Sequence, residues 1–205
     1  YGAKEALRGI DLTLTPGVVL KFPTAAYDLK VDGTLNAVGT AELPVVITSV
    51  RDDSVGGDSN GDGTSTSPSP GDWRRVIFNA GSGGRMEHCV LRYGGYSALG
   101  TLEVVGASPR VAHCVIERGK GVGLDASGPG APRIDSCVFR DNVGNGVTVG
   151  SGMAPTVVAC QFSGNGGQYA FLAQGTGHPN LGDLGNASPD DDGLNSFINT
   201  TQYAL

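Results

Sequence analysis

A cysteine recurs at one fixed place in four successive segments of this chain, and this recurrence restricts the fold more than any other feature. Three segments of the form Pro-x-[Val/Ile]-x-x-Cys-x-[Ile/Phe] align without gaps, and they begin 23 residues apart at Pro109, Pro132 and Pro155. A fourth copy begins at Gly84, 25 residues before Pro109. A fixed period of this length indicates a solenoid, in which each unit buries its apolar face against its neighbours.

Stacking the four copies places their inward side chains in three columns. The columns are Met86, Val111, Ile134 and Val157; Cys89, Cys114, Cys137 and Cys160; and Leu91, Ile116, Phe139 and Phe162. The last two columns are two residues apart, which is the spacing of side chains on one face of a β-strand. The pattern predicts an all-β protein, a single right-handed parallel β-helix over residues 1–205 with roughly eight coils. Leucine-rich repeats compete, but their leucine and asparagine pattern is absent.

The remainder of the chain also predicts short strands separated by turns. Its 34 glycines and 11 prolines interrupt short β-branched runs at regular places, which is typical of many tight turns. In the later units, second strands are expected at Val122–Leu124, Val147–Val149 and Tyr169–Phe171. In the first third, strands are expected at Leu12–Leu14, Val18–Phe22, Leu29–Val31, Val45–Ile47 and Val76–Phe78.

An acidic segment at 51–73 interrupts the repeat and contains a candidate calcium site. Asp58-Ser-Asn60-Gly-Asp62-Gly63 has the D-x-N-x-D-G form, in which oxygens converge because the chain turns tightly at the glycine. The twelfth position is Ser69, so the bidentate glutamate of an EF-hand is missing. A flexible Ser/Pro-rich surface loop is the alternative. The expected ligands are Asp58, Asn60, Asp62 and Thr64 in the motif, with Asp52 and Asp53 from the start of the loop. A second acidic cluster, Ser188–Asn195, lacks this spacing and predicts a solvated turn.

The four cysteines are expected to be free, buried and stacked. Neighbouring strands of a parallel sheet are about 4.8 Å apart, whereas a disulfide needs Cβ atoms about 3.8 Å apart. A disulfide between neighbours stays the first alternative. Zinc is the second, because His88-Cys89 and His113-Cys114 resemble ligand pairs although adjacent residues point to opposite sides.

Charge and hydropathy exclude some partners. The net charge of −6 comes from acids concentrated at 52–72 and 183–192, and no basic stripe accompanies them, so nucleic-acid binding is not expected. No apolar run of a membrane-spanning length occurs. The start at Tyr1 predicts an edge cut within a longer, exported protein, with an extracellular or cell-surface location.

Residues that should point outward from the solenoid could bind a ligand. Arg92, Glu117 and Arg140 occupy successive coils in one column and predict a salt-bridge ladder, which is also where a sugar-binding face could lie. Aromatic rings near the loop could stack on sugars. The candidate ligand-binding residues are Trp73, Tyr93, Arg92, Arg118, Arg140 and Asp141.

Several segments resemble bacterial surface proteins of the pectate-lyase-like right-handed β-helix type. The resemblance is carried by Pro16–Phe22, Leu29–Thr40 and Pro44–Ser49, by the loop Asp52–Trp73, and by the cysteine-bearing coils. It covers nearly the whole chain and implies the fold, whereas function is open because such helices serve as lyases, hydrolases, adhesins and stalks. Gly193–Leu205 resembles the start of a further coil, so the chain is expected to be a piece of a longer solenoid that associates end to end.

Two functions remain in competition. The first is a non-catalytic extracellular module, stabilised by calcium, that binds a polysaccharide or another surface protein. The second is a lyase or glycoside hydrolase acting on an acidic polysaccharide, which needs convergent carboxylates. The acids of the repeats, among them Glu103, Asp125 and Asp141, are expected to fall in different columns, which favours the non-catalytic hypothesis.

Overall fold

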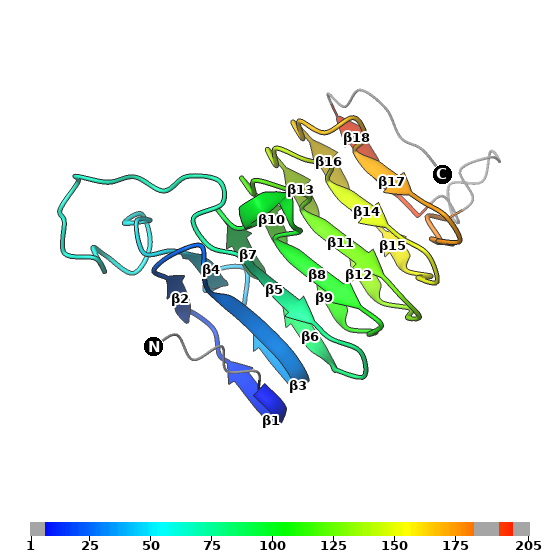
Figure 1. Ribbon diagram of the computed structural model, residues 1–205, viewed down its shortest axis with the longest axis horizontal. Helices are drawn as coiled ribbons and strands as arrows, with labels where there is room; N and C mark the ends of the chain where they lie inside the picture. Colours follow the sequence, from blue (N-terminus) through cyan, green and yellow to red (C-terminus); the bar gives the residue numbers. More distant parts are fainter. Residues whose placement is uncertain (1–6, 183–192, 199–205) are drawn as a thin grey trace.

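The chain winds around one axis as a parallel β-helix, so that strands distant in sequence lie side by side (Figure 1). The computed structural model describes residues 7–182 and 193–198. Within these residues there are an eleven-stranded and a seven-stranded sheet, all of whose pairings are parallel. The seven-stranded sheet corresponds to about seven turns, close to the roughly eight that the sequence predicts. The all-β solenoid prediction is confirmed, since one 3-10 turn, η1 (Tyr96–Ala98), is the sole helical element of the described chain.

The seven-stranded sheet contains one strand from each coil. In stacking order its strands are β2 (Val19–Phe22), β4 (Val45–Ser49), β7 (Cys89–Arg92), β10 (Val115–Glu117), β13 (Val138–Arg140), β16 (Gln161–Ser163) and β18 (Ser196–Ile198).

The eleven-stranded sheet is organised by the long strand β3 (Asp28–Val38). The first half of β3 pairs with β5 and the second half with β6, so two lines of strands diverge from it. One line is β5 (Arg75–Phe78), β8 (Leu102–Val105), β11 (Leu124–Ser127), β14 (Val147–Val149) and β17 (Phe171–Ala173). The other line is β6 (Gly83–Glu87), β9 (Arg110–Ala112), β12 (Arg133–Asp135) and β15 (Thr156–Val158), and β1 (Leu7–Leu14) pairs with β3 from outside.

The three columns that the repeat predicts form one part of the core, and the inward residues of β5, β8, β11, β14 and β17 form another. All twelve residues of the three columns are buried. The aromatic members stack directly: the ring centroids of Phe139 and Phe162 are 5.3 Å apart, and those of Phe162 and Phe197 are 4.9 Å apart. Because every coil contributes to the same columns, the apolar core is continuous along the axis.

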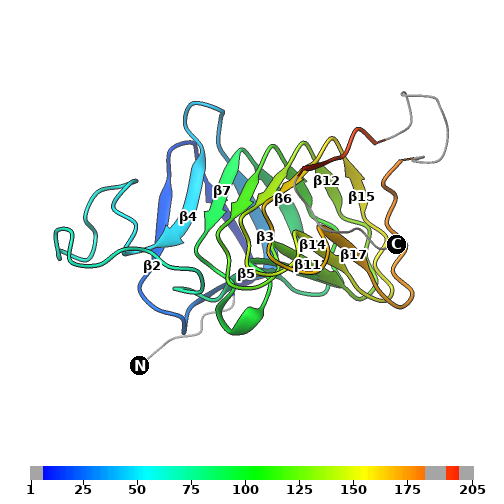
Figure 2. The ribbon, with the colours of Figure 1, turned by 90° about the horizontal axis from the view of Figure 1, so that it is seen from above.

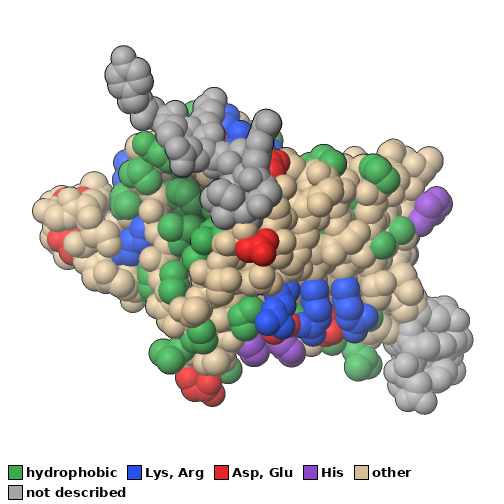
Figure 3. Space-filling model, turned by 90° about the horizontal axis from the view of Figure 1, so that it is seen from below, with side chains coloured by type: hydrophobic (Ala, Val, Ile, Leu, Met, Phe, Trp, Pro, Cys, Tyr) green, Lys and Arg blue, Asp and Glu red, His purple; other side chains and the backbone are tan. Residues whose placement is uncertain are grey.

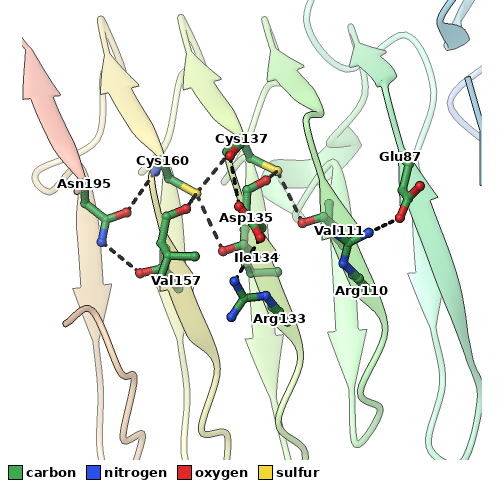
Figure 4. A network of polar contacts seen from close by, with 12 residues as sticks. Glu87, Arg110, Val111, Arg133, Ile134, Asp135, Cys137, Val157, Cys160 and Asn195 are labelled. Atoms are coloured by element: carbon green, nitrogen blue, oxygen red, sulfur yellow. Dashed lines mark hydrogen bonds and ion pairs between the residues drawn. The ribbon is translucent and has the colours of Figure 1, made fainter. Parts of the chain in front are cut away.

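All four cysteines are buried and free of disulfide bonds, and Figure 4 shows Cys137 and Cys160 in neighbouring coils. Each Sγ donates to a backbone carbonyl of the coil below, as Cys114 does to Met86 at 3.4 Å and Cys137 to Val111 at 3.5 Å. In the next coil Asn195 takes the equivalent place, and its amide donates to the carbonyl of Val157 at 2.8 Å. The column is therefore a series of small donors that satisfy carbonyls at a corner.

Two of the expected second strands begin later than the sequence predicts. β11 begins at Leu124 rather than Val122, and β17 at Phe171 rather than Tyr169. The glycines before β11 press against the preceding coil: a Cβ on Gly121 would lie 2.1 Å from the carbonyl oxygen of Leu99. The chain is still turning at this contact, so the strand starts after it.

The corner that follows each strand of the seven-stranded sheet varies in length. It comprises residues 118–123 and 141–146 in two regular coils, but 93–101 in another and 50–74 between β4 and β5. The last of these is the predicted insertion, and it projects beside the N-terminal coils (Figures 1 and 2). Most of the second acidic cluster, and the residues that follow Ile198, lie outside the described chain.

Candidate functional site

The inserted loop is fixed to the solenoid at both of its ends. Near its start, the Asp52 carboxylate accepts hydrogen bonds from Thr48 at 2.7 Å, Ser54 at 2.6 Å and Arg92 at 2.6 Å. Near its end, Asp72 accepts a hydrogen bond from Ser49 at 2.8 Å. These contacts hold the intervening residues over the flank formed by β4 and β7.

Asp52 is part of this anchor and not of the acidic cluster, which contradicts its prediction as a calcium ligand. It is 2% exposed. Burial alone would raise its pKa, but the hydrogen bonds from Ser54 and Thr48 and the charge of Arg92 outweigh burial and lower the pKa. Both carboxylate oxygens are used, so Asp52 stays ionised without a metal.

Three other carboxylates of the loop converge. Oxygens of Asp53, Asp58 and Asp62 lie within 4.8 Å of one another. Oxygens that bind one calcium ion at about 2.4 Å can be at most about 4.8 Å apart, so the cluster has the size of a calcium site. One oxygen of Asp53 and one of Asp62 are buried without a hydrogen-bond partner among the described residues. Gathered carboxylates with unpartnered buried oxygens are costly unless a cation joins them.

The glycines of the motif shape the loop around Asp58. Its carboxylate accepts backbone N–H bonds from Gly61 at 2.7 Å and from Gly63 at 2.8 Å. Both glycines have positive φ, 71° and 68°, which the tight turn requires. The Gly63 bond is the largest influence on Asp58 and lowers its pKa, so this carboxylate is charged at neutral pH.

The other two predicted ligands lie beside the cluster. The amide nitrogen of Asn60 donates to Asp62 at 2.7 Å and to Thr66 at 3.2 Å, so its oxygen would turn towards a metal only if the amide rotated. Thr64 lines an adjacent pocket.

A pocket of about 290 Å³ separates the loop from the solenoid flank. Its charged residues are Arg51, Arg118, Asp52 and Asp53. Its neutral lining is rich in hydroxyl groups: Ser54, Thr64, Thr66, Ser67 and Tyr93, with Pro68. Two of the predicted ligand-binding residues, Tyr93 and Arg118, therefore face a shared cavity, and Asp53 connects that cavity to the carboxylate cluster.

The remaining predicted ligand-binding residues do not join this pocket. Trp73 is 0% exposed, stacks on Phe22 with a centroid distance of 5.0 Å, and donates its indole N–H to the Arg92 carbonyl. The prediction of Trp73 as a sugar platform is wrong, because its ring belongs to the core. Arg140 pairs with Glu117 at 2.6 Å, as the salt-bridge ladder predicts, whereas Arg92 pairs with Asp52 instead of Glu117. Asp141 is exposed and lies outside the pocket lining.

The sequence reading missed one pair of acids. Glu103 on β8 and Asp125 on β11 are register partners on neighbouring strands, so the expectation that the acids occupy different columns is wrong. Burial raises the pKa of both carboxyls, and Asp125 adds to the effect on Glu103, while Arg75 opposes it. Counting an equal number of residues from the cysteine of each coil does not bring Glu103 and Asp125 into register. The reason is that the corner between β7 and β8 is longer than the corner between β10 and β11.

A short basic row lies on the outside of β6, β9 and β12 (Figure 3). Arg85, Arg110 and Arg133 are exposed register partners. Glu87 pairs with Arg110 and Asp135 with Arg133, so much of the charge is balanced. At the adjacent corner the rings of His88 and His113 stack 4.8 Å apart, directed away from the inward cysteines.

The chain belongs to the right-handed β-helix family. The family model described as "Right handed beta helix region" matches residues 74–182, which is more than half of the chain. Neither a curated protein nor a solved structure matches it. Among the described residues, no helix has the length and apolarity needed to cross a bilayer.

Proposed function

We propose that this chain is a non-catalytic β-helix module of an extracellular or cell-surface protein, and that calcium bound by Asp53, Asp58 and Asp62 fixes its inserted loop. The observation that supports this most directly is the convergence of the three carboxylates within 4.8 Å, two of them with unpartnered buried oxygens. A divalent cation would neutralise their repulsion and fill the missing contacts. The loop would then present a fixed surface to a polysaccharide or another surface protein.

The composition of the site favours the proposed location. It offers three carboxylates and no bidentate glutamate at the twelfth position, so its affinity should fall in the range of extracellular calcium modules, with a Kd of about 10⁻⁴–10⁻³ M. At such an affinity the site would be loaded outside the cell. The solenoid would supply a rigid support, and end-to-end association with other coils would extend it.

Calcium titration of the full chain tests this proposal. We expect binding heat by calorimetry, and a rise in melting temperature of about 3–5 °C at a calcium concentration tenfold above Kd. Asp58→Asn and Asp62→Asn should abolish both responses. Glu42→Gln changes an exposed acid outside the loop and should leave both unchanged. Equal melting temperatures in calcium and in EGTA for the unmodified chain would overturn the proposal.

The pair formed by Glu103 and Asp125 favours a second candidate, a polysaccharide lyase or glycoside hydrolase. Two neighbouring carboxyls with raised pKa values can divide acid and base roles. However, both oxygens of Glu103 are already bound, one by Arg75 and the other by the Gly100 N–H. Release of reducing or unsaturated products from acidic polysaccharides, lost in Asp125→Asn, would establish this candidate instead.

A further inference from the structure

Two of the three histidines of the chain, His88 and His113, lie together at the corner between the two sheets (Figure 3). Their rings are nearly parallel, with an interplanar angle of 9° and centroids 4.8 Å apart. His88 is half-buried and His113 is exposed, whereas the adjacent Cys89 and Cys114 are buried in the core. Solvent therefore reaches the two imidazoles but not the thiols, so the imidazoles form a potential ligand pair by themselves.

The backbone of this corner holds the two side chains one coil apart but does not require histidine. His88 and His113 have φ of 48° and 52°, and the equivalent residues of the next two coils, Ser136 and Ala159, have φ of 52° and 53°. The same left-handed turn is thus closed by serine and by alanine. The N–H of His88 donates to the Ala112 carbonyl, in the coil of His113, at 3.1 Å. The fold therefore places the imidazoles side by side without depending on them.

The separation of the rings is close to that of two imidazoles bound to one metal ion. An imidazole nitrogen binds zinc at about 2.0–2.1 Å, so two such nitrogens are about 3.3 Å apart at the tetrahedral angle and at most about 4.2 Å apart. In parallel rings of like orientation, corresponding nitrogens are as far apart as the centroids, which is 4.8 Å here. A tilt of the rings that shortens this distance by about 1 Å completes the geometry. The exposed His113 side chain can make this movement without leaving the core.

The charges near the pair are compatible with a bound cation. Two arginines of the basic row are balanced, because Arg110 pairs with Glu87 and Arg133 with Asp135. Glu87 directly precedes His88, so a carboxylate accompanies the imidazoles. Imidazole nitrogen is a ligand for zinc, copper and nickel, whereas calcium takes oxygen ligands. The ligand type therefore distinguishes this pair from the carboxylate cluster of the inserted loop.

We propose that His88 and His113 bind one divalent transition-metal ion, such as copper(II) or zinc, and that the ion links two successive coils on the surface of the solenoid. Water completes the coordination, since the protein supplies two nitrogens. The pair includes no residue of the inserted loop, so this inference is independent of the proposed calcium site. Because the ion binds the folded arrangement of two coils, it should raise the melting temperature.

Calorimetric titration of the full chain with copper(II) tests the inference, because copper(II) binds most tightly among the divalent ions of this series. Excess calcium in the buffer occupies the carboxylate cluster. We expect one copper ion per chain, and a rise in melting temperature of about 3–5 °C at a copper concentration tenfold above Kd. The electron paramagnetic resonance spectrum of the bound copper should show two nitrogen ligands.

Two matched variants separate the pair from the rest of the chain. His113→Ser introduces the residue that closes the same corner in the next coil, so it should fold normally and lower the copper affinity about tenfold or more. His178→Ser removes the third histidine, which is exposed and distant in the sequence, and should leave the affinity unchanged. His88→Ser provides a second test of the pair and should match His113→Ser. Equal copper affinity in His113→Ser and the unmodified chain, or a spectrum with a single nitrogen ligand, would overturn the inference.

Discussion

Arg92 on β7 donates its Nε–H to the Asp52 carboxylate at 2.6 Å, and this bond joins the solenoid wall to the first residues of the inserted loop. Removing the guanidinium would leave a buried carboxylate without its counter-charge. This ion pair lies between groups of the folded protein, so it should stabilise the fold whether or not a metal binds.

Arg92→Met should therefore lower the free energy of unfolding by about 3 kcal/mol at neutral pH. The pKa of Asp52 is lowered by folding, so its contribution is present above the unfolded-state pKa and is lost as pH falls through the folded-state value. Urea denaturation at several pH values measures both effects. Arg133→Met breaks an exposed pair with Asp135 and should lower the free energy of unfolding by less than about 1 kcal/mol. Equal decreases for Arg92→Met and Arg133→Met would contradict the stabilising role of the Arg92–Asp52 pair.

Asp125→Asn should stabilise the fold at neutral pH by about 0.5–1 kcal/mol, because like charges on opposed strand positions are unfavourable. Burial raises the pKa of Asp125, so folding favours its protonated form and stability declines as pH rises through the folded-state value. The benefit of the asparagine should consequently disappear in acid. Denaturation curves at neutral and acidic pH check this, with Glu42→Gln as the exposed control; an unchanged stability at neutral pH would contradict it.

The four thiols should resist modification in the native protein. Burial raises the pKa of Cys114, and the thiolate is the reactive form. We expect a thiol reagent such as DTNB to label slowly under native conditions and to detect all four cysteines after denaturation without reductant. Fast native labelling would show that the corner opens, and fewer than four thiols after denaturation would show a disulfide.

Asn142→Ala should be among the costly polar substitutions. The buried Asn142 side chain accepts from the Gly119 N–H at 2.9 Å and donates to the Ile116 carbonyl at 3.0 Å. Truncation leaves the buried Gly119 N–H without a partner and removes one of the bonds to the Ile116 carbonyl, so it should cost about 1–3 kcal/mol by denaturant titration. Asn165→Ala, at the half-buried equivalent position, should cost less.

The cysteine-bearing coils could be aligned from sequence because their corner is closed by one residue. His88 and His113 each turn the chain there with φ near 50°, so inward positions keep a constant spacing. The next corner has no constant length, and its glycines make contacts that depend on the preceding coil. The register of Glu103 against Asp125 could therefore not be counted from the cysteines.

The candidate metal site was predictable in part. The D-x-N-x-D-G motif identified Asp58 and Asp62, but it could not distinguish Asp52 from Asp53. These neighbours point in different directions, one towards Arg92 and the other into the acidic cluster. That choice depends on β7, which lies far along the chain, and local sequence does not encode it.

The unequal corners also divide the molecule into a part that is fixed in length and a part that is not. An added residue between β9 and β10 would turn a cysteine out of the core, whereas the corner between β4 and β5 accommodates residues 50–74 over an intact pair of sheets. The solenoid is thus a fixed scaffold with one corner of variable length in each coil. Replacing the loop at such a corner offers a way to change the side chains displayed on the surface while the core sequence stays unchanged.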